Sequence, residues 1–173
     1  MNPSEPERNP ESMTIIREKC LRWLARRNHS CHEIRLKCKQ KGFDEEDILT
    51  VTEELINKKL LDDDRFAREY AEQKTVLHGW GPLKIRAYLS EKGVKKQYID
   101  TAVNNLYTSG DKVDQLAEIL RKTAKSTTRR ILRMPPGPKR RKKLADFLMR
   151  RGFPPSMVYE YTDRLFRKLE NDF

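Results

Sequence analysis

The sequence has little apolar material and no long hydrophobic run. Hydrophobic residues account for 36% of the 173 residues and charged residues for another 36%, whereas average domains are about 45–50% apolar and about 25% charged. This composition disfavours a single large core and favours several small helical units. No stretch approaches the roughly 20 apolar residues of a membrane-spanning helix, so we expect the chain not to cross a bilayer.

Cysteine is also scarce. Cys20, Cys31 and Cys38 are too few, and odd in number, for a disulfide framework, and this usage suits a reducing compartment. The N-terminal segment has neither the basic nor the apolar region of a secretory signal. We therefore expect a cytoplasmic protein. Residues 1–12, which are polar and contain three prolines, are predicted to be disordered.

The patterns that indicate catalysis are missing as well. The Gly-Trp-Gly segment at 79–81 lacks the third glycine and the lysine of a nucleotide-binding loop. A possible zinc cluster overlaps a predicted helix cap, which is the simpler interpretation, and comprises His29, Cys31, His32 and Cys38. Acidic clusters stand at predicted helix starts, where the helix dipole explains them. We expect no metal, no cofactor and no enzymatic activity.

Acidic residues are absent from one long segment. None occurs between Glu118 and Asp146, and residues 110–173 hold 17 Lys and Arg against 8 Asp and Glu, so most of the net charge of +11 lies there. Such a block attracts polyanions, nucleic acid above all, although a solvated, disordered basic loop is an open alternative. The candidate contact residues are Arg129, Arg130, Arg133, Lys139, Arg140, Arg141, Lys142, Lys143, Arg150 and Arg151.

Aromatic residues do not occur among these basic positions, which argues against a base-stacking platform. In the middle of the chain, Tyr88 is expected to pack in a core. Trp80 stands in a predicted turn, where both core packing and an exposed contact remain open.

Three glycines reveal an internal repeat. Around Gly42, Gly93 and Gly152, apolar residues recur eight and four positions before and six and thirteen positions after the glycine. These spacings predict one helix on each side of the glycine, which would adopt the left-handed conformation that ends a helix. The same motif predicts hydrophobic contacts between Phe43 and Cys38, Val94 and Leu89, and Phe153 and Leu148.

A further amphipathic segment precedes each pair, which gives an all-α protein of three tandem three-helix repeats in an elongated, curved, solenoid-like row. The predicted repeats occupy residues 13–61, 62–109 and 110–173. Helix starts are indicated by a Ser30–Glu33 capping box, Asp62, Pro82 and Pro138. A basic, proline-rich insertion at 126–143 distinguishes the third repeat, and its first part, 126–138, is predicted to be a loop.

Five short segments, in this order and spacing, resemble the RecX family of bacterial proteins that regulate the RecA recombinase. They are Arg27–Ile34, Lys41–Asp44, Leu60–Ala67, Gly79–Pro82 and Lys92–Val94. The resemblance covers residues 15–106 well and the remainder loosely. It implies tandem three-helix repeats, in agreement with the repeats found from the glycines.

The resemblance also implies a function. It implies a non-enzymatic modulator, expected to be negative, that docks along the groove of the RecA–DNA filament and limits its extension, ATP hydrolysis, strand exchange and co-protease activity. The basic last third would then lie against the DNA phosphates or against acidic faces of the filament. A monomer is expected because no long apolar stripe is left over. A stand-alone nucleic-acid-binding protein and a partner-binding adaptor without a nucleic-acid role are the alternatives.

Overall fold

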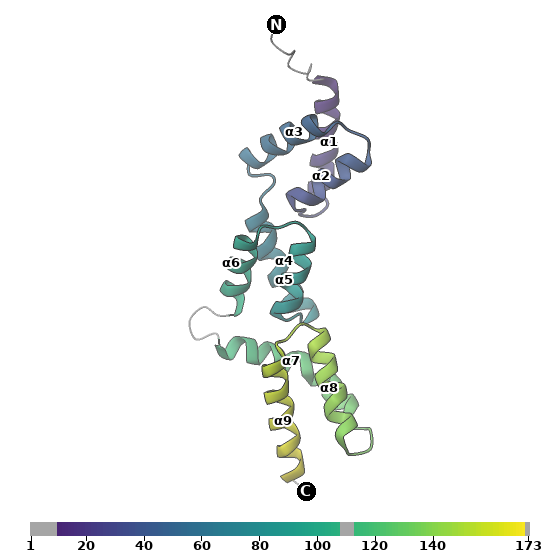
Figure 1. The fold of residues 1–173 in the computed structure, drawn as a ribbon, viewed down its shortest axis with the longest axis vertical. Helices are drawn as coiled ribbons and strands as arrows, with labels where there is room; N and C mark the ends of the chain where they lie inside the picture. The colour runs from purple at the N-terminus through teal and green to yellow at the C-terminus, as the bar shows by residue number, and fades with distance from the viewer. Residues whose placement is uncertain (1–9, 108–112, 172–173) are drawn as a thin grey trace.

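The computed structural model describes residues 10–107 and 113–171, which form nine helices and no strand (Figure 1). The all-α fold expected from the repeats is confirmed. The helices are α1 (Pro10–Leu24), α2 (Cys31–Gln40), α3 (Glu45–Asn57), α4 (Asp63–His78), α5 (Pro82–Glu91), α6 (Lys96–Tyr107), α7 (Val113–Ile131), α8 (Pro138–Arg150) and α9 (Pro155–Asn171).

Three separate cores divide these helices into units of three. The first unit, α1–α3, buries residues such as Ile34, Cys38 and Leu55, and the second, α4–α6, buries an equivalent set around Ile85 and Leu89. The third unit, α7–α9, does the same with Leu144, Leu148 and Phe153. Leu116 and Ile119 of α7 pack against both the second and the third core, so adjacent units support one another.

The glycine turns have the predicted conformation. Gly42, Gly93 and Gly152 have φ angles of 80°, 69° and 86°. In each case the next residue donates a backbone hydrogen bond to the residue four before the glycine: Phe43 to Cys38, Val94 to Leu89 and Phe153 to Leu148, over 3.1–3.4 Å. These bonds define a Schellman ending and bring together the residue pairs expected from the sequence.

The helix starts follow the expected caps. The Ser30 side chain accepts from the Glu33 backbone in a complete capping box, and the Asp62 carboxylate accepts from the backbone nitrogen of Arg65 at 2.9 Å. Pro82 and Pro138 are the first residues of α5 and α8.

The expected loop at 126–138 is wrong over its first half, because α7 continues to Ile131. Leu120, Ala124, Thr127 and Ile131 are buried, and their spacing of three and four residues places them on one helix face against the third core. Only residues 132–137 form the connection. The basic run that follows lies in α8, so the disordered-loop interpretation is wrong too.

The expected disorder of residues 1–12 is also partly wrong. Residues 1–9 lie outside the described part of the chain, but α1 begins at Pro10, where a proline costs little because the first helical N–H has no partner. Glu11 in the first turn suits the positive helix end, and Met13 packs against the first core.

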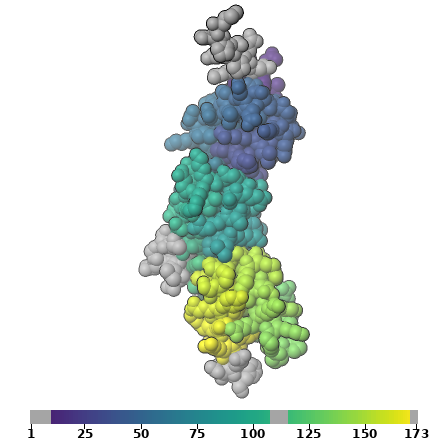
Figure 2. Space-filling model, viewed as in Figure 1, coloured from purple at the N-terminus to yellow at the C-terminus, as the bar shows by residue number. Residues whose placement is uncertain are grey.

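The three units are joined in an elongated, slightly bowed row (Figures 1 and 2). At each junction, the N-terminus of one unit's second helix meets the C-terminal turn of the next unit's second helix. The Ser30 hydroxyl donates to the Lys92 carbonyl at 2.6 Å, and the Gly81 nitrogen donates to the Arg151 carbonyl at 2.7 Å. The helices α2, α5 and α8 thus form a column in which opposite ends of the helix dipoles meet.

No helix within residues 10–107 and 113–171 has both the length and the apolar character that crossing a membrane would require.

Candidate nucleic-acid interface

The ten predicted contact residues lie on α7, on α8, in their connection and, for Arg151, directly after α8, but they do not form one patch. Three of them have partners within the chain. Arg140 donates to the carbonyls of Leu132 and Met134, and Arg141 forms an ion pair with Asp163 of α9. Each of these contacts holds α8 against a neighbouring segment.

Arg151 is the third residue with an internal partner. Its guanidinium donates to the carbonyl of His78 at the end of α4 and lies 5.1 Å from the centre of the Phe147 ring. These contacts connect the second and third units. Arg140, Arg141 and Arg151 therefore have structural roles that their charge alone does not reveal.

Three other predicted residues converge on one groove. Arg130 of α7 and Lys143 and Arg150 of α8 line a groove of about 480 Å³ between the two helices. Phe147 lies in the same groove, and Asp146 is the acidic residue in its lining. This α7–α8 groove is positive and accessible from solvent, as a phosphate-binding surface requires.

Arg129 lies on a different groove of α7. With Lys125 and Tyr161 of α9 it lines a space of about 410 Å³. Arg121 and Lys122 belong to the same lining but form ion pairs with Glu118, at 2.6 and 3.5 Å.

Sequence reasoning named Arg129 and missed its neighbours. Arg121, Lys125 and Arg129 are spaced by four residues, and this spacing would have shown that they share one helix face. No sequence signal indicates that Tyr161 lines this groove, because only the folding of the chain brings α9 next to it. Burial raises the pKa of Tyr161, more strongly than the positive charge of Arg121 lowers it, so the phenol stays a neutral hydrogen-bond donor.

The remaining predicted residues, Arg133, Lys139 and Lys142, are exposed. Arg133 follows α7, and the two lysines lie in the first turns of α8.

The second unit carries an aromatic cluster covered by lysines. Tyr70 and Tyr88 stack with ring centres 4.4 Å apart, and Trp80 packs edge-on against both. The ammonium groups of Lys74, Lys84 and Lys92 lie within 4.5–5.7 Å of these rings. Trp80 also packs against the second core, whereas Tyr88 is half-buried on Tyr70 outside the buried core.

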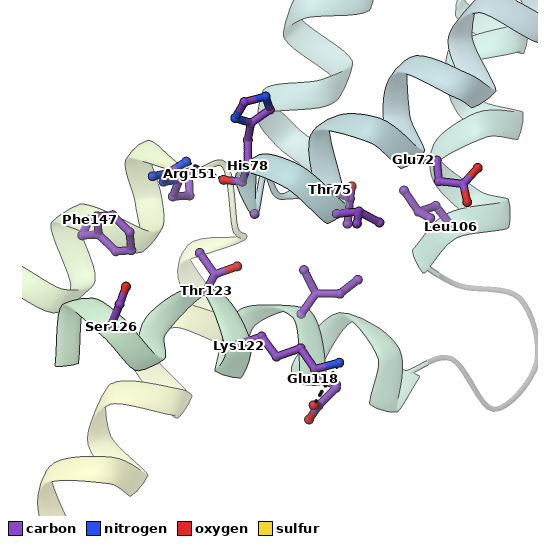
Figure 3. A pocket seen from close by; sticks show the side chains of 13 residues that line it. Glu72, Thr75, His78, Leu106, Glu118, Lys122, Thr123, Ser126, Phe147 and Arg151 are labelled. Atoms are coloured by element: carbon purple, nitrogen blue, oxygen red, sulfur yellow. Dashed lines mark hydrogen bonds and ion pairs between the residues drawn. The ribbon is translucent and has the colours of Figure 1, made fainter. Parts of the chain in front are cut away.

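The junction between the second and third units contains a groove of about 570 Å³ (Figure 3). We call it the junction groove. It lies between the C-terminal half of α4 and the helix α7. Phe147 of α8 and Arg151, which follows α8, close one end (Figure 3). Its apolar lining residues are Val76, Leu106, Ile119 and Phe147. Its charged lining residues are Glu72, Glu118, Lys122 and Arg151.

The first junction contains a partly buried charge network. Glu33 forms ion pairs with Arg27 and Lys92, both at 3.1 Å. Burial opposes ionisation of Glu33, but the hydrogen bonds and charges of these two partners outweigh it and lower its pKa to about 2. The hydrogen bond that the Lys92 ammonium donates to the Glu33 carboxylate in turn raises the pKa of Lys92. This network fixes the first unit to the second.

Of the residues of the possible zinc cluster, Cys38 lies in the first core, Cys31 packs against it and His32 is exposed. The His29 ring contacts the Arg27 carbonyl at 2.9 Å and the Lys37 ammonium at 3.1 Å, and Cys38 is buried 3.7 Å from Cys20. Within residues 10–107 and 113–171, no three His, Cys, Asp or Glu side chains are grouped so that they could hold a metal ion.

These features define a tandem three-helix-repeat protein with two grooves lined by basic residues on its third unit. Family models of RecX match all three units: the first three-helix domain at 17–55, the second at 62–103 and the third at 113–162. The chain is 36% identical over 133 residues to the regulatory protein RecX of Chlorobaculum tepidum, covering 77% of each chain. The chain belongs to the RecX family.

Other relatives agree. Identity to the regulatory protein RecX of Prosthecochloris aestuarii is 33% over 147 residues, covering 83% of this chain and 88% of the relative. A crystal structure of regulatory protein RecX superposes with a TM-score of 0.75 at 25% identity, covering 88% and 72% of the two chains. RecX from Lactobacillus salivarius shares the fold, with a TM-score of 0.76 at 20% identity over 94% and 99%. The chain is thus a member of a family of regulatory proteins.

Proposed function

We propose that this chain is a non-enzymatic, negative regulator of the RecA recombinase. It docks along the groove of the RecA–DNA filament as a monomer in the cytoplasm. There it limits filament extension, ATP hydrolysis, strand exchange and co-protease activity. The regulatory names of its relatives support the general role, and the sequence resemblance supplies the partner.

The observation that carries the proposal is the joined row of three units. Backbone and side-chain hydrogen bonds at both junctions make one elongated body from three similar modules. A filament presents the same surface at regular intervals, so successive units can contact successive protomers. Linked contacts of modest strength then combine through effective concentration.

The basic surfaces of the third unit provide a DNA contact. Lys125 and Arg129 face one groove of α7, while Arg130, Lys143 and Arg150 face the α7–α8 groove. Contacts of this kind with phosphates release counterions, so binding weakens steeply as salt rises.

The experiment that tests the proposal is a titration of the protein into RecA hydrolysing ATP on single-stranded DNA at fixed salt. Inhibition at well below one molecule per RecA monomer supports docking on the filament. Inhibition that begins only when the protein covers bare DNA, or no inhibition, overturns the proposal. A stand-alone nucleic-acid-binding protein, which the basic grooves also favour, would then be the better description.

A charge-reversal pair separates the two functions further. The double variant Lys125→Glu, Arg129→Glu removes the exposed charge of one α7 groove. A matched double variant, Arg26→Glu, Lys95→Glu, makes the same charge change at exposed positions on the first two units. If the protein is a stand-alone nucleic-acid-binding protein, only the first variant loses affinity for bare DNA, and there is no other function for either variant to retain. A filament regulator keeps part of its RecA inhibition in both variants.

A further inference from the structure

The first core holds two thiols in contact with each other. Cys20 of α1 and Cys38 of α2 are fully buried, and their Sγ atoms lie 3.7 Å apart. At this separation one thiol donates a weak S–H hydrogen bond to the sulfur of the other. The two cysteines are thus paired in space, although they belong to different helices.

Packing alone does not require a cysteine at this place. Cys38 stands four residues before the glycine of its repeat, and the equivalent residues of the second and third units are Leu89 and Leu148, both fully buried. A leucine therefore fills this position in two of the three cores, whereas the first core has a cysteine beside a second cysteine. Two thiols in contact can be oxidised to a covalent bond, which a leucine cannot form.

Closing this pair into a disulfide needs a small movement of the two side chains. The sulfur atoms must approach from 3.7 Å to about 2.05 Å. Both cysteines lie within four residues of a helix end, at Leu24 and Gln40, where helices adjust more readily than in their middle. Cys31 cannot replace Cys20 as the partner of Cys38, because seven residues along α2 separate their Cα atoms by about 10 Å and a disulfide allows at most about 7 Å.

The hydrogen bond between the two thiols also distinguishes their reactivity. The bond that Cys20 donates lowers the pKa of Cys38 more strongly than burial raises it, whereas the same bond and burial both raise the pKa of Cys20. Cys38 therefore forms a thiolate, the form that attacks oxidants, more readily than Cys20 does. Burial and the carboxylate of Asp63 raise the pKa of Cys31 to about 12, so Cys31 stays a thiol.

We propose that Cys20 and Cys38 form a reversible disulfide, made by hydrogen peroxide and reduced again by two molecules of a small thiol, which end as a disulfide themselves. In the first step, the thiolate of Cys38 attacks one peroxide oxygen. The O–O bond breaks, and the hydroxide that leaves takes the proton of the Cys38 thiol and becomes water. In the second step, the sulfur of Cys20 attacks the sulfenic acid on Cys38. The S–S bond forms, the S–O bond breaks, and the leaving hydroxide takes the Cys20 proton as a second water, so that the two thiols have given two electrons to the peroxide.

Burial determines how fast this bond forms and how long it lasts. Because both sulfurs are fully buried, peroxide reaches Cys38 when the end of α2 opens locally. Oxidation is therefore slow, and the same burial shields the finished bond from reductants. The bond ties α1 to α2 across 18 positions of the chain. Closing a loop of this length restricts the unfolded chain, so the oxidised first unit resists unfolding more than the reduced one.

Peptide mapping of the oxidised full-length protein tests the site. The folded protein is treated with hydrogen peroxide for several hours, free thiols are alkylated, and the digest is analysed by mass spectrometry before and after reduction. We expect one crosslink, between Cys20 and Cys38, which disappears on reduction, and an alkylated Cys31. Sulfinic or sulfonic acids at single cysteines without a crosslink, a crosslink to Cys31, or three unmodified thiols overturn the proposal.

Two variants provide a matched control, because each leaves two cysteines in the chain. Cys31→Ala keeps the pair and should form the crosslink as fully as the wild type, whereas Cys20→Ala should form none. If Cys20→Ala does not fold, the comparison of wild type with Cys31→Ala still decides.

The thermal midpoint is the second readout. Oxidation should raise it by about 5 °C in the wild type and in Cys31→Ala, and should change it by less than about 1 °C in Cys20→Ala. An unchanged or lower midpoint in the crosslinked wild type shows that the folded first unit does not accommodate the bond, and overturns the proposal. These measurements use the protein alone, so their failure leaves the proposed RecA function untouched.

Discussion

The hydroxyl of Ser30 donates a 2.6 Å hydrogen bond to the carbonyl of Lys92, 62 residues further along the chain. Ser30 is the N-cap of α2 and Lys92 is the C-cap of α5, so one side chain serves both helix ends. At the second junction, where Gly81 is the N-cap, backbone N–H groups make the equivalent bonds to the carbonyls of Arg151 and Gly152. The units are therefore joined by the same groups that cap their helices.

Replacing Ser30 by Ala tests this double role. The variant loses the bond from the Glu33 backbone and leaves the Lys92 carbonyl without its partner. We expect the free energy of unfolding to fall by about 2 kcal/mol, the sum of a lost cap and a lost buried hydrogen bond. Urea unfolding measures this change. Ser90→Ala, at an exposed position on α5, is the control and should stay within about 0.5 kcal/mol of the wild type.

Two glycines with similar backbone angles provide a second test. Gly42 and Gly152 have φ angles of 80° and 86°, but a β-carbon at Gly42 would meet nothing within 4 Å, whereas one at Gly152 would overlap the backbone of Lys84. Gly42→Ala should cost about 1–2 kcal/mol for the left-handed conformation. Gly152→Ala should cost clearly more, because the second junction must also open.

Unfolding midpoints compare the costs of the two glycine substitutions, and small-angle scattering detects the open junction as a larger radius of gyration in Gly152→Ala alone. Equal costs with unchanged dimensions would show that the second junction tolerates the added carbon.

The repeats could be predicted because their signals are local. A glycine that ends a helix and a serine that caps one act through backbone angles and bonds within five residues. The sequence itself therefore reveals that Gly42 and Gly93 end helices and that Ser30 caps one, but not that Ser30 also bonds to Lys92. The same holds for Asp62, whose carboxylate bonds three residues ahead.

The extent of α7 and the roles of the basic residues were harder to predict. Prolines and charge suggested a loop after residue 125, but the burial of Thr127 and Ile131 against the third core decides in favour of helix. The partners of Arg141 and Arg151 are 22 and 73 residues distant in the chain. Only the packing of the helices brings them together, so charge alone could not separate structural arginines from accessible ones.

Acid should weaken the first junction. Arg27 and Lys92 outweigh the effect of burial and lower the pKa of Glu33 from 4.5 to about 2, so the folded state favours the carboxylate more than the unfolded state does. The resulting stability is present above about pH 4.5 and is lost as the pH falls towards 2. We expect a loss of roughly 2 kcal/mol over this interval after allowance for partial solvent screening.

Urea unfolding at pH 7 and at pH 3 measures the effect. Glu33→Gln should be less stable than the wild type at pH 7 and should show a flatter decline in acid. Glu53→Gln, at an exposed position on α3, should follow the wild type. A decline in Glu33→Gln as steep as that of the wild type would assign the acid sensitivity to other carboxylates.

Adjacent residues of the basic run should respond differently to substitution. Arg140 donates to the Leu132 carbonyl at 2.8 Å and to the Met134 carbonyl, and so ties the start of α8 to the segment that follows α7, whereas Lys139 is exposed. Hydrogen bonds to a charged group contribute about 1.5–3 kcal/mol. Arg140→Ala should therefore lower the thermal midpoint by several degrees, and Lys139→Ala should leave it unchanged.

Each variant loses one positive charge, so their affinities for single-stranded DNA at low salt should decrease by similar factors. Thermal unfolding beside DNA titration separates the two effects, and an unaltered midpoint in Arg140→Ala would mean that its charge serves binding alone.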